Sequence, residues 1–209
     1  YYVESSPKSQ LQPILHQQEY AKPGDELRFK VPCIFNVETR QAVIPSTELF
    51  DRQYDLYGPE WKEDGKAVTF EYNERGHKTY RVLELDAETG KVRTLVEESS
   101  PTFVNYSRMF RHVLKGGKEM IWMSERDNWN HLYMIDLEKG KVARQITKGD
   151  WVVRRVLKVD EDNQVIYFTA SGVNPKEDPY HVHYYKINMD GKETVSYTHL
   201  RAHETTLHL

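Results

Sequence analysis

Apolar and polar positions alternate along this chain in short runs that return about every 50 residues. Four similar polar turns mark the period, and their last residues, Arg40, Gly90, Gly140 and Gly191, are separated by 50, 50 and 51 positions. Each turn follows a strand-like run: PCIFNV, YRVLELD, LYMIDL and YYKINM. The pattern therefore predicts a β-hairpin around each polar turn.

The earlier half of each unit predicts a second hairpin. The segments 60–73, 110–126 and 156–171 each place an apolar strand before a polar turn and another strand after it. Two hairpins per period make four strands in about 50 residues, which is the size of one β-propeller blade. Tandem small β-domains are the alternative, but the Pro/Gly/Ser-rich linkers expected between such domains do not occur.

We therefore predict an all-β fold, a partial β-propeller of about three to four four-stranded blades from a larger ring, truncated at both ends. Three clear units and a partial first one fall at the low end of the blade range. A small four-bladed ring is the alternative, but the first unit begins at Tyr1 without its inner strands. Between Ser5 and Asp25, three prolines and no regular period predict an extended excursion from a blade.

Composition limits the partners of the chain. Of its 209 residues 38% are apolar and 29% charged, with a formal net charge of −3, so there is no electrostatic reason to expect nucleic-acid binding. No apolar run is long enough to span a bilayer. Cys33 is the only cysteine, which excludes an internal disulfide.

The stretch FVNYSRMFRH (103–112) carries the best candidates for a binding site. It places Arg108 and Arg111 at the entry to a blade, where a side chain can face the central channel of a propeller and bind a carboxylate or carbonyl oxygen. The alternative is that one of them pairs with a carboxylate of the neighbouring blade. Glu97 and Glu98 end a strand, and we expect them on the surface.

Other motifs narrow the chemistry further. The nucleophile elbow G-x-S-x-G, a Walker loop and G-x-G-x-x-G do not occur in the sequence, so we predict no catalytic residue and no cofactor site in this chain. Trp61, Trp129 and Trp151 fall near predicted strand starts, and we expect them to pack between blades.

The end of the chain differs from the rest. VSYTHLRAHET (195–205) places His199 and His203 four residues apart, the spacing of helical zinc ligands, but supplies no further ligand set nearby. The stretch resembles one reading frame of a transposase-type sequencing adapter. We therefore predict that 195–209 is a non-native, unstructured tail, that 1–194 is the propeller domain, and that the chain has no metal site.

Two longer stretches resemble a known family. SERDNWNHLYMIDLEKGKVARQITKGDWVV (124–153) and IYFTASGVNPKEDPYHVHYYKINMDG (166–191) are similar to the N-terminal β-propeller of bacterial dipeptidyl-peptidase IV-like serine peptidases, in the prolyl oligopeptidase family. Residues 1–25 and 100–112 fit the same family. The resemblance extends over residues 1–194.

This resemblance implies a parent enzyme with two domains. The propeller, of about eight blades, would cover a C-terminal α/β-hydrolase domain that carries a Ser-Asp-His triad. Peptides would be the substrates, and cleavage would release N-terminal dipeptides with Pro or Ala in second place. A stand-alone propeller that serves as a binding scaffold, without a hydrolase domain, is the alternative.

The resemblance also implies where the functional residues lie. The triad is expected beyond Gly191 and the amine-binding glutamate pair before Tyr1, so this chain by itself should be inactive. The family contributes one arginine from the segment that matches 103–112, which leaves Arg108 and Arg111 as candidates. A parent of this type is expected to be periplasmic or secreted and to need no cofactor, with a homodimer left open.

The adapter interpretation makes a prediction about the source DNA. We expect independent reads of the parent gene to diverge from this sequence at codon 195 and to continue with another blade. Mapping the reads that underlie the sequence is the measurement. Genomic reads that run unchanged through Val195 to Leu209 would contradict the interpretation.

Overall fold

The computed structural model describes residues 1–17, 22, 24–26, 28–192 and 194–196. Its architecture is all-β, as predicted, with a single short 3₁₀ helix, η1 (Tyr106–Arg108), among the described residues. The strands are β1 (Tyr2–Glu4), β2 (Ile14–His16), β3 (Ile34–Asn36), β4 (Gln41–Val43), β5 (Gln53–Trp61), β6 (Ala67–Glu74), β7 (Thr79–Asp86), β8 (Val92–Ser99), β9 (Arg111–Val113), β10 (Glu119–Ser124), β11 (His131–Asp136), β12 (Lys141–Gln145), β13 (Val152–Asp160), β14 (Val165–Ser171), β15 (Val182–Asn188) and β16 (Val195–Ser196).

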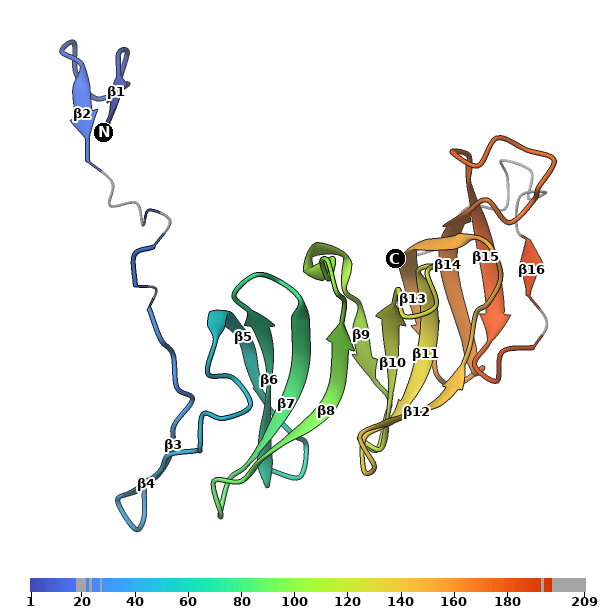
Figure 1. Cartoon of the computed structure of the whole chain (residues 1–209), viewed down its shortest axis with the longest axis horizontal. Helices are drawn as coiled ribbons and strands as arrows, with labels where there is room; N and C mark the ends of the chain where they lie inside the picture. The colour runs from blue at the N-terminus through green and yellow to red at the C-terminus, as the bar shows by residue number, and fades with distance from the viewer. Residues whose placement is uncertain (18–21, 23, 27, 193, 197–209) are drawn as a thin grey trace.

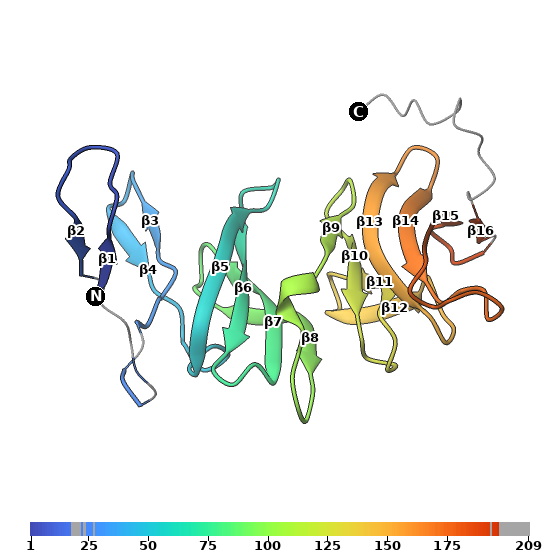
Figure 2. The same cartoon turned by 90° about the horizontal axis from the view of Figure 1, so that it is seen from above.

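Three antiparallel four-stranded sheets make up most of the molecule. We call them blade I (β5–β8), blade II (β9–β12) and blade III (β13–β16), because each has its four strands in sequence order. The blades stand side by side in an open arc (Figures 1 and 2). The prediction of a partial propeller built from four-stranded blades is therefore confirmed. Within the described part of the chain, no helix is long and apolar enough to cross a membrane.

The hydrophobic core lies between the blades. Successive side chains of β10 point to opposite faces of blade II, so Trp122 packs against blade I while Ile121 and Met123 pack against blade III. Strand β7 divides in the same way, with Val82 facing blade II and Leu83 facing the opposite side. Because both faces are covered, these strands are apolar throughout instead of alternating apolar and polar residues.

Three of the four turns that set the sequence period share one structure. In each of these three an Asn or Asp side-chain oxygen accepts hydrogen bonds from the backbone N–H groups two and three residues later. Asn36 accepts both at 3.0 Å, Asp86 at 3.2 and 2.7 Å, and Asp136 both at 3.0 Å. These hydrogen bonds fix the turns locally, which is why the sequence alone locates them.

Two of these turn carboxylates have a lowered pKa. The Thr89 hydroxyl and nearby backbone N–H groups lower the pKa of Asp86, and the Lys139 ammonium with backbone N–H groups lowers the pKa of Asp136. A group whose pKa falls on folding stabilises the fold above its unfolded value, which is about 3.9 for Asp. That contribution is lost as the pH falls through the folded value.

The last residues of the three later turns, all glycines, also meet the preceding unit. A Cβ on Gly140 would lie 2.7 Å from the Thr94 carbonyl oxygen in β8, and one on Gly191 would lie 3.0 Å from the Ile146 carbonyl oxygen beyond β12. Both glycines have positive φ angles, 63° and 83°. Glycine is thus required twice over at these positions, for the backbone conformation and for the contact between blades.

Arginines on the fourth strands join neighbouring blades in a repeated way. Arg93 Nη1 on β8 donates to the Glu138 carbonyl oxygen at 3.1 Å, and Arg144 Nε on β12 donates to the Met189 carbonyl oxygen at 3.1 Å. Each acceptor belongs to the third-to-fourth-strand turn of the next blade. The 50-residue period therefore repeats the contacts between blades as well as the strands.

The N-terminal region differs from the prediction. The expected excursion over Ser5–Asp25 contains β2, which pairs with β1 in a separate hairpin (Figure 1), and β3 with β4 forms another two-stranded sheet. The β1–β2 hairpin is joined by a Glu4–His16 contact of 2.9 Å and by stacking of Tyr2 on His16. Such cross-strand pairs leave no periodic signal in the sequence.

Two tryptophan predictions were wrong. Trp151 packs against the core between blades II and III as expected. Trp61 and Trp129 are 58% and 38% exposed, because Trp61 ends the edge strand β5 and Trp129 lies in the β10–β11 turn. The predicted tail, 195–209, lies outside the described residues except for Val195 and Ser196, which form β16 against β15.

The glycine contact predicts a difference between two alanine variants. We expect Gly65→Ala to destabilise the chain by about 1–2 kcal/mol, since φ is 67° and no atom lies within 4 Å of the new Cβ. Gly140→Ala adds a clash with a backbone carbonyl and should cost about 1–3 kcal/mol more. Urea unfolding followed by tryptophan fluorescence measures both. Equal losses would mean that the contact between blades does not constrain this turn.

Candidate functional site

The described structure has two notable pockets, near opposite ends of the blades. The first, which we call the groove, is lined largely by the β5–β6, β9–β10 and β11–β12 turns. The second, which we call the loop pocket, lies where the β8–β9 loop meets the β10–β11 turn. The β8–β9 loop, the β10–β11 turn and the β14–β15 loop all lie at the same end of the blades (Figure 1).

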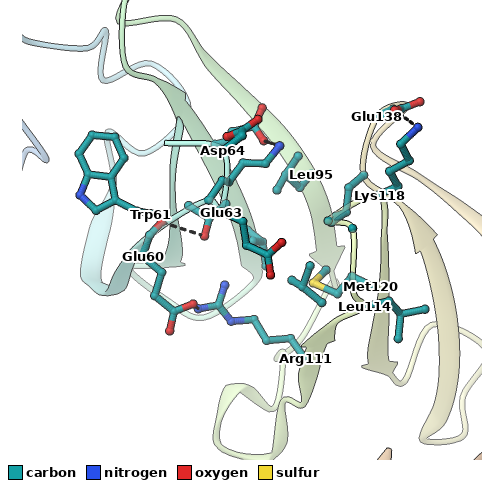
Figure 3. Close-up of a pocket in the computed structure, with 18 of the residues that line it drawn as sticks. Glu60, Trp61, Glu63, Asp64, Leu95, Arg111, Leu114, Lys118, Met120 and Glu138 are labelled. Carbon is teal, nitrogen blue, oxygen red and sulfur yellow. Dashed lines mark hydrogen bonds and ion pairs between the residues drawn. The ribbon is translucent and has the colours of Figure 1, made fainter. Parts of the chain in front are cut away.

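The groove has a volume of about 410 Å³ and runs between blades I and II (Figure 3). Its basic side chains are paired with carboxylates. Lys62 lies 3.0 Å and Arg93 lies 2.6 Å from Glu84, while Lys118 lies 3.5 Å from Glu138. Burial tends to raise the pKa of Glu84, but its contacts with Arg93 and Lys62 outweigh this effect and lower that pKa. Charges that satisfy one another leave the groove poorly suited to bind a charged ligand.

Arg111 belongs to this groove and joins two blades. Its Nε lies 2.7 Å from Glu71 and its Nη2 lies 3.2 Å from Glu60, both on blade I, and its side chain is 18% exposed. Glu71 also accepts a hydrogen bond from Tyr80, and burial together with this bond raises the pKa of the Tyr80 phenol. The arginine is thus held in a network between blades.

Arg108, the other sequence candidate, lines the loop pocket, which has a volume of about 390 Å³. It ends η1, its side chain is exposed, and none of the hydrogen bonds or ion pairs found among the described residues engages its guanidinium. The two arginines are therefore placed in different pockets. Other residues of the loop pocket are Glu98, Phe103, Asn105, Ser124, Glu125, Arg126, Asn128 and Asn130.

Hydrogen bonds hold the β8–β9 loop in place both before and after Arg108. Ser100 Oγ accepts the backbone N–H groups of Thr102 and Phe103, both at 3.2 Å, which turns the chain after β8. Val104 is buried and its N–H donates to the His77 carbonyl oxygen at 2.7 Å. On the other side the Phe110 carbonyl accepts the Met123 N–H at 3.0 Å. The position of Arg108 is thereby set while its side chain projects from the loop.

Glu98 is the buried charge of the loop pocket, and the expectation that it lies on the surface was wrong. It is 7% exposed and accepts hydrogen bonds from Trp122 Nε1 at 2.7 Å, from Ser124 Oγ at 2.8 Å and from the Arg126 guanidinium. Glu97, next to it, is exposed, because side chains alternate along β8. A strand end predicts exposure only where no neighbouring blade covers it, and blade II covers this one.

Arg126 connects this network to an aromatic ring. Its guanidinium lies 5.0 Å from the centre of the Tyr133 ring, and its Nε donates to Ser124 Oγ at 2.9 Å. Burial and the nearby Asp127 carboxylate raise the pKa of the Tyr133 phenol. Arg126 is thus committed to Glu98 and Tyr133, which leaves Arg108 as the exposed cation of the loop pocket.

Metal-ligating side chains gather at one place in the described structure. Glu177, His181 and His183 bring their ligand atoms within 4.8 Å of one another beside the start of β15. The sequence-based prediction that there is no metal site did not consider these residues, because the glutamate comes from a loop. The other histidine pair considered, His199 and His203, lies outside the described residues.

The fold and the two pockets define the chain as a β-propeller segment whose blades meet through buried faces and which presents loops at one end. A family model described as "Dipeptidyl peptidase IV (DPP IV) N-terminal region" matches residues 1–207. The chain belongs to this family.

Relatives and solved structures agree with this assignment. Dipeptidyl peptidase 4 of Trichophyton rubrum is 35% identical over 161 residues, which cover 74% of this chain and 20% of that protein. The crystal structure of Porphyromonas gingivalis dipeptidyl peptidase 4 superposes with a TM-score of 0.71 and 18% identity over 93% of this chain and 27% of that one. A putative dipeptidyl aminopeptidase IV of Bacteroides ovatus has a TM-score of 0.54 and 21% identity, over 77% of this chain and 24% of that one. The chain thus spans between about a fifth and about a quarter of the length of each.

The Glu98 network predicts unequal effects for two adjacent substitutions. Glu98→Gln puts an amide donor among three donors, and we expect a loss of about 2–4 kcal/mol in the free energy of unfolding. Glu97→Gln removes only an exposed pair with Arg81 and should cost about 0–1 kcal/mol. Urea unfolding of both variants is the measurement. A loss at Glu97 equal to that at Glu98 would contradict the assigned network.

Proposed function

We propose that this chain is the substrate-gating part of a serine exopeptidase that releases N-terminal dipeptides, with Pro or Ala in second place, from peptides. In the complete protein a C-terminal α/β-hydrolase domain supplies the Ser-Asp-His triad. The membership of the chain in the dipeptidyl peptidase IV N-terminal family carries the proposal. The complete protein, on the same family basis, is periplasmic or secreted.

The loop pocket is the part of this chain that we assign to the substrate. Its opening lies between loops at one end of the blades, and it holds both hydrogen-bonding groups and an exposed guanidinium. A guanidinium donates up to five hydrogen bonds and is suited to a peptide carbonyl or carboxylate. We therefore assign substrate binding to Arg108, and a bracing role between blades to Arg111.

The outer face of blade III also fits a larger ring. Val182 and Tyr184, on alternate positions of β15, are 48% and 58% exposed, whereas Tyr185 between the two blades is buried. A further blade packed on this face would cover them, as blade III covers blade II. This supports a propeller larger than the three blades described.

The test uses the complete protein, expressed from the full open reading frame. We expect it to release dipeptides from an X-Pro chromogenic substrate, and this chain alone to release none. Arg108→Ala in the complete protein should raise KM by about 10–100-fold, the value of a hydrogen bond to a charged group, without lowering the thermal midpoint. Arg108→Lys should restore part of the affinity.

Arg111→Ala is the matched control. Because it leaves Glu71 without its partner, it should lower the thermal midpoint of the complete protein more than Arg108→Ala does. An unchanged KM for Arg108→Ala would contradict the substrate role. An open reading frame that closes a propeller and stops, with no hydrolase domain, would instead support a stand-alone binding scaffold.

A further inference from the structure

The β14–β15 loop brings together three side chains that commonly bind metals. Glu177 lies in the loop, His181 is the last residue before β15, and His183 is the second residue of that strand. Their ligand atoms all lie within 4.8 Å of one another. Tetrahedral zinc sites, with bonds of 2.0–2.2 Å, hold ligand atoms about 3.4 Å apart, which lies within the range of separations in this set.

Local structure explains why the three converge. His181 and His183 are two residues apart in an extended segment, so their side chains leave the same face of the strand. Two consecutive turns return the loop to that face, since the Glu177 N–H donates to the Asn174 carbonyl at 3.2 Å and the His181 N–H to the Asp178 carbonyl at 3.0 Å. The glutamate is thereby brought back over the histidines.

The carboxylate is held in a fixed orientation. Glu177 Oε1 accepts a hydrogen bond from Asn174 Nδ2 at 2.8 Å. The other carboxylate oxygen, Oε2, lies 2.8 Å from His183 Nε2. Orientation of a ligating carboxylate by a second hydrogen bond is a usual feature of metal sites. The two imidazole rings lie 6.3 Å apart and almost perpendicular, at 89°.

His183 Nε2 faces the Glu177 carboxylate. This atom is buried, and although it lies close to the Glu177 carboxylate it makes no hydrogen bond of acceptable geometry among the described residues. The imidazole nitrogen and the carboxylate oxygen are therefore neighbours, as two ligands of one ion must be. A cation bound by both groups would replace their direct contact, with the two ligand atoms moving apart to about 3.4 Å.

We propose that Glu177, His181 and His183 form a binding site for one divalent transition-metal ion, with Zn²⁺ as the ion that fits best. Two imidazole nitrogens and one carboxylate oxygen suit Zn²⁺, and the fourth position of a tetrahedral site remains for water. Ca²⁺ and Mg²⁺ prefer sets made of oxygen alone, so they fit poorly.

Bound metal would tie the loop to blade III. The base of the loop is already closed, since a Cβ on Gly172 would meet Trp151 at 3.7 Å and Pro179 at 4.0 Å. Trp151 in turn stacks on Phe168 of the core between blades II and III. The ion would therefore order a loop at the same end of the blades as the loop pocket, and it would stabilise the folded chain by mass action.

The test is a titration of the metal-free full chain with Zn²⁺ by isothermal calorimetry. We expect one equivalent to bind, and the double variant His181→Ala/His183→Ala to weaken this binding at least 100-fold. Glu177→Gln should weaken it about tenfold. Addition of Zn²⁺ should raise the thermal midpoint of the parent chain and leave that of the double variant unchanged, while Ca²⁺ and Mg²⁺ should have no effect on either.

His199→Ala/His203→Ala is the matched control, because it removes the same number of histidines from the C-terminal segment. This control variant should still bind one metal ion. Co²⁺ bound to the control variant should give the visible absorption of a tetrahedral complex. Circular dichroism of the metal-free variants separates loss of binding from loss of fold. Absence of binding to the parent chain, or binding that survives in the His181/His183 variant, would overturn the proposal.

Discussion

Each four-stranded blade of this molecule has apolar side chains on both faces, and this constraint determines how the blades are arranged. A sheet of this kind is stable only when another sheet covers each face. Blade II meets the constraint within the chain, with Trp122 packed toward blade I and Ile121 toward blade III. The repeated sequence, the row of blades and the close glycine contacts between them all follow from the need to stack equal units.

How far the sequence predicts this fold depends on the range of the interactions involved. The turns around Asp86 and Asp136 are recognisable because the side chain that forms the turn lies within three residues of its partners. Strand positions are recognisable because alternation is also local. The burial of Glu98 depends on Trp122 of the next blade, and a single sequence contains no signal for that partnership.

The candidate site shows the same limit. The sequence locates Arg108 and Arg111 three residues apart in one segment and cannot separate their roles. The structure separates them because Arg108 ends η1 on the loop while Arg111 begins β9, from which it reaches Glu71 on blade I. The Glu177 group was missed for a related reason, since a His-x-His pair in a strand gives no indication that a loop returns a carboxylate to it.

Charged groups join neighbouring blades at both ends of the blades, as the Glu98–Arg126 pair does at the loop end. At the end with the groove, charged groups join neighbouring blades, as when Glu161 accepts the Lys115 N–H at 2.7 Å and lies 2.9 Å from His112. At the other end the connections are longer, and they carry Arg108 and the histidines of the β14–β15 loop. Bracing charges are neutralised by their partners and are therefore unavailable to a ligand. In the loop pocket Glu98 and Arg126 neutralise each other in this way, whereas Arg108 stays exposed beside them, so a substitution of Arg108 leaves the contact between blades I and II intact.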